Sequence, residues 1–133
     1  MTTTNRTHLG QDERQLATVG LKAFFRIADL WDLDVEEQRL LLGQPKRSTF
    51  FEWKKQQDRE LNVDTVERLS YLMGIYKALQ ILFPDSAIAD RWIRMPAHIY
   101  PFNGKAPIDY MKQGTIGALY QVRSYLDGWR GEA

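Results

Sequence analysis

The sequence predicts an all-α protein with a helix-turn-helix core of about four helices and a small C-terminal helical lobe. Apolar residues recur at helical spacing through most of the chain, which is the main signal for amphipathic helices. Capping residues and Gly or Pro stops divide these stretches into separate helices. No segment alternates apolar and polar residues as a half-buried strand does. The 133 residues suffice to bury a core without disulfides or metals.

The first two helices are predicted from a long apolar stripe and a capping motif. Residues 15–33 place apolar side chains at i, i+3, i+4 and i+7. Asp34 then has the type and position of an N-cap, and Glu37 lies where it completes a capping box. The helix that they open covers residues 35–42, and Gly43 supplies its C-terminal stop.

A tight turn separates the second helix from the third. Pro45 cannot continue a helix and biases the residue before it away from helical geometry, so residues 44–47 are predicted to turn. Ser48 is expected to cap a third helix over residues 49–57. Two short helices joined by a tight turn are typical of the helix-turn-helix motif.

The fourth helix is the longest, over residues 63–83, with Asn62 at its start and Pro84 at its end. Two neighbouring apolar stripes cover much of its circumference, which is typical of a central core helix or of a subunit interface. We expect the surplus apolar surface to form a homodimer contact. The residues assigned to that contact are Leu72, Ile75, Tyr76 and Leu79.

The rest of the chain is predicted to form the C-terminal lobe. A short helix covers residues 86–94, a loop of about a dozen residues covers 95–106, and Pro107 begins a further helix that reaches residue 113. Thr115 caps a last helix that ends near residue 129. The expected domain organisation is a flexible N-terminus at 1–14, a helix-turn-helix domain at 15–83 and a partner-binding domain at 84–133.

The composition argues against an enzyme, a metalloprotein and a membrane protein. The chain has no cysteine and only two histidines, and no cluster of acidic residues has ligand spacing beside either histidine. No nucleophile with a base, carboxylate pair or cofactor motif can be assembled, so we expect no catalytic residue, metal or cofactor. The longest apolar run is too short to span a bilayer, and the first ten residues lack a signal-peptide core. We therefore expect a cytoplasmic protein.

Basic residues concentrate on the third predicted helix. The whole chain carries a net charge of +1, but residues 44–59 carry +3 between two acidic segments. A basic stripe is typical of nucleic-acid binding, and the start of a recognition helix reaches base edges and phosphates in the major groove. The alternative is a helical hairpin whose lysines are only solvated. The residues expected to contact DNA are Lys46, Arg47, Ser48, Thr49, Lys54 and Lys55.

The C-terminal lobe is rich in aromatic residues, and residues 91–133 carry a net charge of +3. Trp, Tyr and Arg are the residue types that dominate protein–protein hot spots. The alternative is that the rings only form the core of the lobe. Because a lobe of this size cannot bury all of them, we expect some to face a protein partner.

The residue strings resemble a known family. The runs GLKAFFRIADLWDLDVEEQRLLLG (20–43), PKRSTFFEWKK (45–55) and VERLSYLMGIYKALQILFPD (66–85) resemble the Xre-type antitoxin helix-turn-helix domain. Asn103-Gly104-Lys105 and VRSYLDGWRG (122–131) resemble the toxin-binding domain shared by Xre, MbcA and ParS antitoxins. The resemblance covers roughly residues 20–131.

This resemblance implies a type II antitoxin in the bacterial cytoplasm. Such a protein binds and occludes the active site of a RES-type toxin, which degrades NAD or transfers ADP-ribose from it, and represses its own operon by binding operator DNA. Because such operators are usually palindromic, we expect a homodimer. The alternative is a stand-alone transcriptional regulator whose lobe binds a ligand or itself. The residues expected to contact the toxin are Trp92, Phe102, Asn103, Lys105, Arg123, Tyr125, Trp129 and Arg130.

Overall fold

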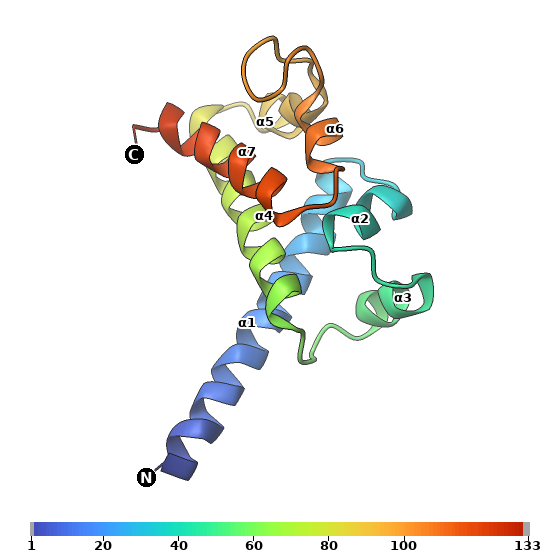
Figure 1. The fold of residues 1–133 in the computed structure, drawn as a ribbon, viewed down its shortest axis with the longest axis vertical. Coiled ribbons are helices and arrows are strands. Elements are labelled where there is room, and N and C mark those ends of the chain that lie inside the picture. Colours follow the sequence, from blue (N-terminus) through green and yellow to red (C-terminus); the bar gives the residue numbers. More distant parts are fainter. Residues whose placement is uncertain (1, 132–133) are drawn as a thin grey trace.

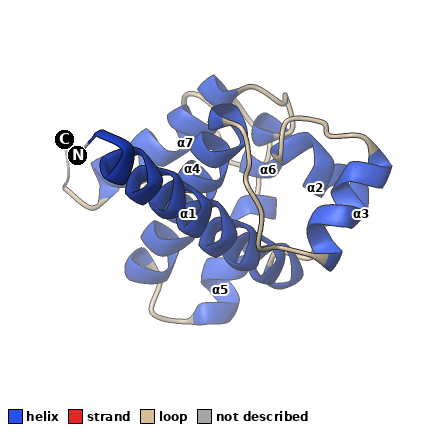
Figure 2. Ribbon diagram, turned by 90° about the horizontal axis from the view of Figure 1, so that it is seen from below, coloured by secondary structure: helices blue, strands red, loops and turns tan. Residues whose placement is uncertain are grey.

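The computed structural model describes the backbone of residues 2–131 and the side chains of residues 11–131, and this part of the chain is all helical, as predicted. Seven α-helices and one short 3-10 helix follow one another without a strand in the described residues (Figures 1 and 2). They are α1 (Thr2–Leu30), α2 (Val35–Leu41), α3 (Arg47–Lys55), α4 (Val63–Leu82), α5 (Ser86–Arg91), η1 (Trp92–Arg94), α6 (Pro107–Met111) and α7 (Ile116–Trp129).

Helix α1 begins much earlier than the periodicity predicted. It starts at Thr2, so the segment 1–14 that we expected to be flexible is helical wherever its backbone is described. This early part projects away from the other helices (Figure 1). The buried side chains of α1 start at Ala17, which is 1% exposed. The apolar stripe therefore marks where α1 joins the core and gives no sign of where the helix begins.

Helix α4 is the central core helix, and this corrects the dimer contact predicted for three of its four residues. It packs against α1 on one side and α7 on the other. Leu72, Ile75 and Leu79 are each 0% exposed, and the half-buried Tyr76 places its ring 6.4 Å from the ring of Trp31. Leu72, Ile75 and Leu79 are covered within the same chain, so a second copy cannot contact these three buried residues.

The helix-turn-helix region and the C-terminal lobe share one hydrophobic core. Buried side chains continue without a break from α1 and α4 into η1, the following loop and α7. Trp92 is 9% exposed and Phe102 is 1% exposed, so both belong to this core. The two predicted pieces are thus joined through packing as well as through the link at residues 84–85.

The caps at Asp34, Asn62 and Thr115 were predicted correctly, but the cap at Ser48 and some boundaries were not. The backbone N–H of Glu37 donates to Asp34 Oδ1 at 2.8 Å, and that of Asp34 donates to Glu37 Oε1 at 3.0 Å, which completes the capping box. Helix α3 begins at Arg47, so Ser48 lies inside the helix, and Lys46 at the N-cap position makes no capping bond. Helix α6 ends at Met111, before the expected residue 113.

Candidate functional site

Helix α3 is fixed to the body of the protein by a buried ring. Phe50 is 0% exposed and lies edge-on to Phe25 of α1, with 5.7 Å between the ring centroids. Gly43 and Gln44 have positive φ values of 93° and 62°, which give the turn from α2 to α3 its left-handed backbone. The half-buried Trp53 packs against the same core. These contacts hold α3 at the edge of the molecule with its other face in solvent (Figure 2).

The residues expected to contact DNA lie together on and beside α3. Five of the six are exposed, and Thr49 is half-buried. Arg59, which follows the helix, turns back to donate to the carbonyl of Gln56 at 2.9 Å. In the described part of the chain, the side chains of Lys46, Lys54 and Lys55 make no hydrogen bond or ion pair. The exposed cations of α3 are thus available for phosphate groups.

Arg47 is the exception among these cations, because it is already paired. Its Nη1 donates to Glu36 Oε1 at 2.8 Å, and its guanidinium lies 5.5 Å from the centre of the Phe51 ring. Glu36 also accepts hydrogen bonds from Arg39 at 3.0 and 2.9 Å. The Arg39 bond, together with the charges of Arg39 and Arg47, keeps the pKa of Glu36 below its ordinary value.

The aromatic residues of the C-terminal lobe form a cluster that is mostly buried. Tyr125 stacks on Trp92 at 6.3 Å and meets Phe102 edge-on at 5.5 Å, and burial raises the pKa of Tyr125. Trp129 continues the cluster, with its ring 5.6 Å from that of Tyr125 and 6.1 Å from that of Phe83. Trp129 is 54% exposed, so the outer end of the cluster is open to solvent.

This arrangement corrects part of the predicted toxin contact. Trp92 and Phe102 are buried core residues: Trp92 stacks on Tyr125 and Phe102 meets Tyr125 edge-on, so both support the surface from beneath. Asn103 and Lys105 are exposed in the loop before α6, where Asn103 has a positive φ of 53°. The half-buried Arg123 lies 3.4 Å from Asp127.

The outward-facing residues of this lobe include those of the loop 95–106 and of the end of α7. Arg130, which is half-buried at the end of α7, lies 3.8 Å from Asp127. The loop also exposes Met95, Ile99 and Tyr100, with Tyr100 75% exposed. The predicted toxin contact did not include these three side chains, although an aperiodic loop that carries large apolar residues is itself a signal for binding.

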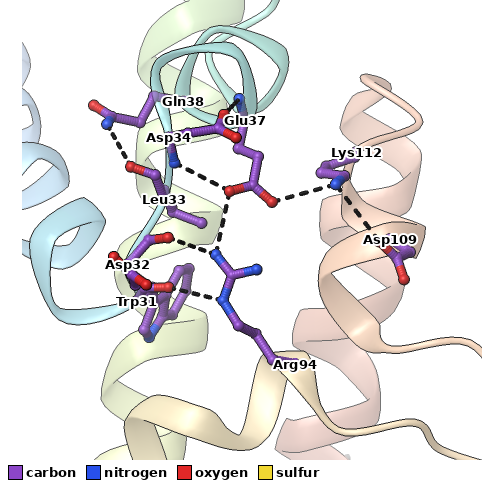
Figure 3. A network of polar contacts seen from close by, with 9 residues as sticks. All are labelled: Trp31, Asp32, Leu33, Asp34, Glu37, Gln38, Arg94, Asp109 and Lys112. Carbon is purple, nitrogen blue, oxygen red and sulfur yellow. Dashed lines mark hydrogen bonds and ion pairs between the residues drawn. The ribbon is translucent and has the colours of Figure 1, made fainter.

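A buried carboxylate connects the lobe to the helix-turn-helix region (Figure 3). Glu37 of α2 is 8% exposed and accepts hydrogen bonds from Arg94 Nη2 and Lys112 Nζ, each at 3.2 Å. Arg94 also donates to the backbone carbonyls of Trp31 at 3.2 Å and Asp32 at 2.7 Å. Two cations of the lobe thus hold the start of α2 and the turn that precedes it.

The pKa of Glu37 reflects these contacts. Burial raises it, but the hydrogen bonds from the Asp34 backbone, Arg94 and Lys112 outweigh burial and keep the pKa below its ordinary value. The sequence pointed to Glu37 only as part of a capping box. Its partners lie 57 and 75 residues away, and no local pattern links positions at such separations.

A groove between α1 and the start of α4 is a further feature that the sequence did not predict. It has a volume of about 510 Å³ and an apolar floor that includes Leu16, Leu61, Val63 and Val66. Leu16 is 52% exposed and Val63 is 82% exposed. Exposed apolar side chains that gather in one place are typical of interaction surfaces.

Among the residues that the structure describes, no group of three His, Cys, Asp or Glu is placed to hold a metal ion. No helix in that part of the chain is long and apolar enough to cross a membrane.

Comparisons with known proteins match both halves of the chain. Residues 10–74 match the family model of the antitoxin Xre-like helix-turn-helix domain, and residues 78–131 match that of the antitoxin Xre/MbcA/ParS C-terminal toxin-binding domain. The chain is also similar to the uncharacterized protein y4oB of Sinorhizobium fredii (strain NBRC 101917 / NGR234). The two are 52% identical over 111 residues, which cover 84% of each chain. The boundary between the two matched regions falls inside α4.

Proposed function

The chain belongs to the antitoxin family that joins an Xre-like helix-turn-helix domain to the Xre/MbcA/ParS toxin-binding domain, and from this membership we propose its action in three steps. It binds a RES-type, NAD-consuming toxin, occludes the active site of that toxin, and represses its own operon by binding operator DNA. It acts without catalysing a reaction and in the bacterial cytoplasm. The observation that carries the proposal is the match of residues 78–131 to the toxin-binding domain.

The proposed toxin contact uses the exposed parts of the lobe. Trp129 offers a large half-exposed ring at the end of an otherwise buried aromatic cluster, which is the usual setting of a binding hot spot. The loop 95–106 adds exposed apolar and polar side chains, among them Asn103 and Lys105. Arg123 and Arg130 lie beside Asp127. In the complex, their positive charge would occupy the place that the phosphates of NAD take in the free toxin. Inhibition then follows from steric occlusion of the NAD cleft.

Co-expression tests this proposal directly. We expect the chain to restore growth of cells that express a RES-type protein from the neighbouring reading frame, and to co-purify with it. Arg47→Ala is the matched control, because Arg47 lies on α3 and not on the lobe, so this variant should neutralise the toxin like the wild type. Absence of both rescue and co-purification would contradict the proposal.

The proposed DNA contact is the exposed face of α3. The three unpaired lysines and Arg47 supply charge for phosphates and base edges. Binding of the chain to the DNA upstream of its own gene, measured by electrophoretic mobility shift, tests this part. Retained binding after charge reversal across α3 would place the DNA site elsewhere.

A palindromic operator calls for two copies of the chain, so we also propose a homodimer. Its contact lies outside the buried face of α4, since Leu72, Ile75 and Leu79 are covered within the chain. The groove between α1 and α4 is the surface that we assign to it, because Leu16 of α1 and Val63 of α4 are exposed apolar side chains there. Light scattering at micromolar concentration should give the mass of a dimer.

A further inference from the structure

Glu36 and Phe51 hold Arg47 from two directions. The carboxylate of Glu36, in the first turn of α2, binds Arg47 Nη1 at 2.8 Å. The ring of Phe51, one turn along α3, lies 5.5 Å from the guanidinium carbon. A guanidinium stacks favourably on an aromatic face. Arg47 is therefore restrained although its side chain is 58% exposed.

The remaining donors of Arg47 point to a role in reading bases. Nη1 is used by Glu36, but Nε and Nη2 make no hydrogen bond in the described part of the chain. Two neighbouring N–H donors of an arginine match the O6 and N7 acceptors of guanine, which is the commonest base-specific contact in the major groove. Arg47 is the first residue of α3, the end of a recognition helix that reaches the bases.

Glu36 has a second effect on DNA binding, because it opposes contact with phosphate. A phosphate that took the charge of Arg47 would compete with a carboxylate already bound to it and would be repelled by that carboxylate. A guanine edge carries no net charge, and it can bind the two free donors while Glu36 keeps the third. The pair thus favours a base contact over a phosphate contact at this position.

We propose that Glu36 and Phe51 together hold Arg47 in position to read a guanine, and that Glu36 is therefore a determinant of DNA sequence specificity. This inference rests on the proposed DNA-binding function of α3. Neutralising Glu36 should strengthen non-specific binding and leave binding to the preferred sequence nearly unchanged. The specificity ratio should fall by about tenfold, which lies within the discrimination that one bidentate arginine–guanine contact supplies.

The test is selection from a pool of random-sequence DNA duplexes, followed by affinity measurements on the selected duplex and on a duplex of unselected sequence. Glu36→Gln should bind the unselected duplex more tightly and enrich a motif that has lost its preference for one guanine. Phe51→Leu should weaken the same preference without a change in charge.

Glu52→Gln is the matched control. Glu52 lies exposed on α3 and its side chain pairs with no cation in the described residues, so this variant makes the same change in net charge without touching Arg47. An equal loss of specificity in Glu36→Gln and Glu52→Gln, or no loss in either, would overturn the inference. Failure of the wild type to enrich any sequence would instead contradict the proposed DNA-binding function.

Discussion

The buried carboxylate of Glu37 gives the sharpest stability prediction. Glu37→Gln keeps the size of the side chain and an acceptor for the backbone N–H of Asp34, but it removes the charge that Arg94 and Lys112 face. A hydrogen bond to a charged group contributes about 1 kcal/mol more than one between neutral groups. The side chains of both cations are about one-third exposed, at 38% and 31%, so we assign no more than about 1 kcal/mol to each charged hydrogen bond. The expected loss is about 2 kcal/mol.

Thermal unfolding followed by circular dichroism measures this loss. A chain of 133 residues has an unfolding entropy of about 280 cal/mol/K, so about 2 kcal/mol lowers the Tm by about 7 °C. The control is Glu36→Gln, the same chemical change at the neighbouring but exposed carboxylate. It should move the Tm by about 2 °C or less.

Equal Tm values for the two variants would refute this reasoning, because they would mean that the lobe does not hold α2 through Glu37. A second transition in Glu37→Gln, seen by different probes at different temperatures, would support the role of Glu37 as a link between the two regions.

Four further predictions concern Glu37, the face of α3, the end of α7 and the groove. The folded-state pKa of Glu37 lies below the ordinary value of 4.5. The contribution of the Glu37 carboxylate to stability is therefore complete above that pH and is lost as the pH falls through the folded pKa. The difference in urea midpoint between wild type and Glu37→Gln should be full at pH 7 and shrink on acidification below 4.5. Lys54→Ala should weaken operator binding, and the slope of log K against log salt should flatten by about 1, measured by fluorescence anisotropy; an unchanged slope would remove Lys54 from the DNA contact. Trp129→Ala should weaken toxin binding by about 30-fold or more in calorimetry with its helical circular-dichroism spectrum retained, and full affinity would place the hot spot elsewhere. Val63→Glu, at a side chain that is 82% exposed, should give a folded monomer in light scattering, and a persistent dimer would exclude the groove as the contact.

Local features of the fold were predictable from sequence because their causes are local. Asp34, Asn62 and Thr115 each cap a helix with a side chain that accepts from a backbone N–H three residues ahead. Such a bond depends only on neighbouring residue types. The start of α1 was not predicted, because residues 2–14 have no apolar periodicity that would indicate a helix.

Features that depend on residues distant in sequence were not predictable. The second apolar stripe of α4 has the same sequence pattern whether it packs against α7 of its own chain or against a second copy. In the structure it packs against α7. Composition likewise cannot separate a buried ring from a binding ring, so Trp92 and Phe102 were assigned to the toxin contact although they support it from the core. The exposed face of α3 was predictable because the charged side chains of a short helix lie in solvent.

The central claim is that this chain silences a toxin by covering its active site, and NAD consumption tests it most directly. The proposed partner, a RES-type toxin, should consume NAD when it is purified alone. Addition of this chain should abolish that consumption as the two reach equal concentrations, and Trp129→Ala should need a higher concentration to do so. An undiminished rate of NAD loss in the presence of excess folded chain would contradict the account.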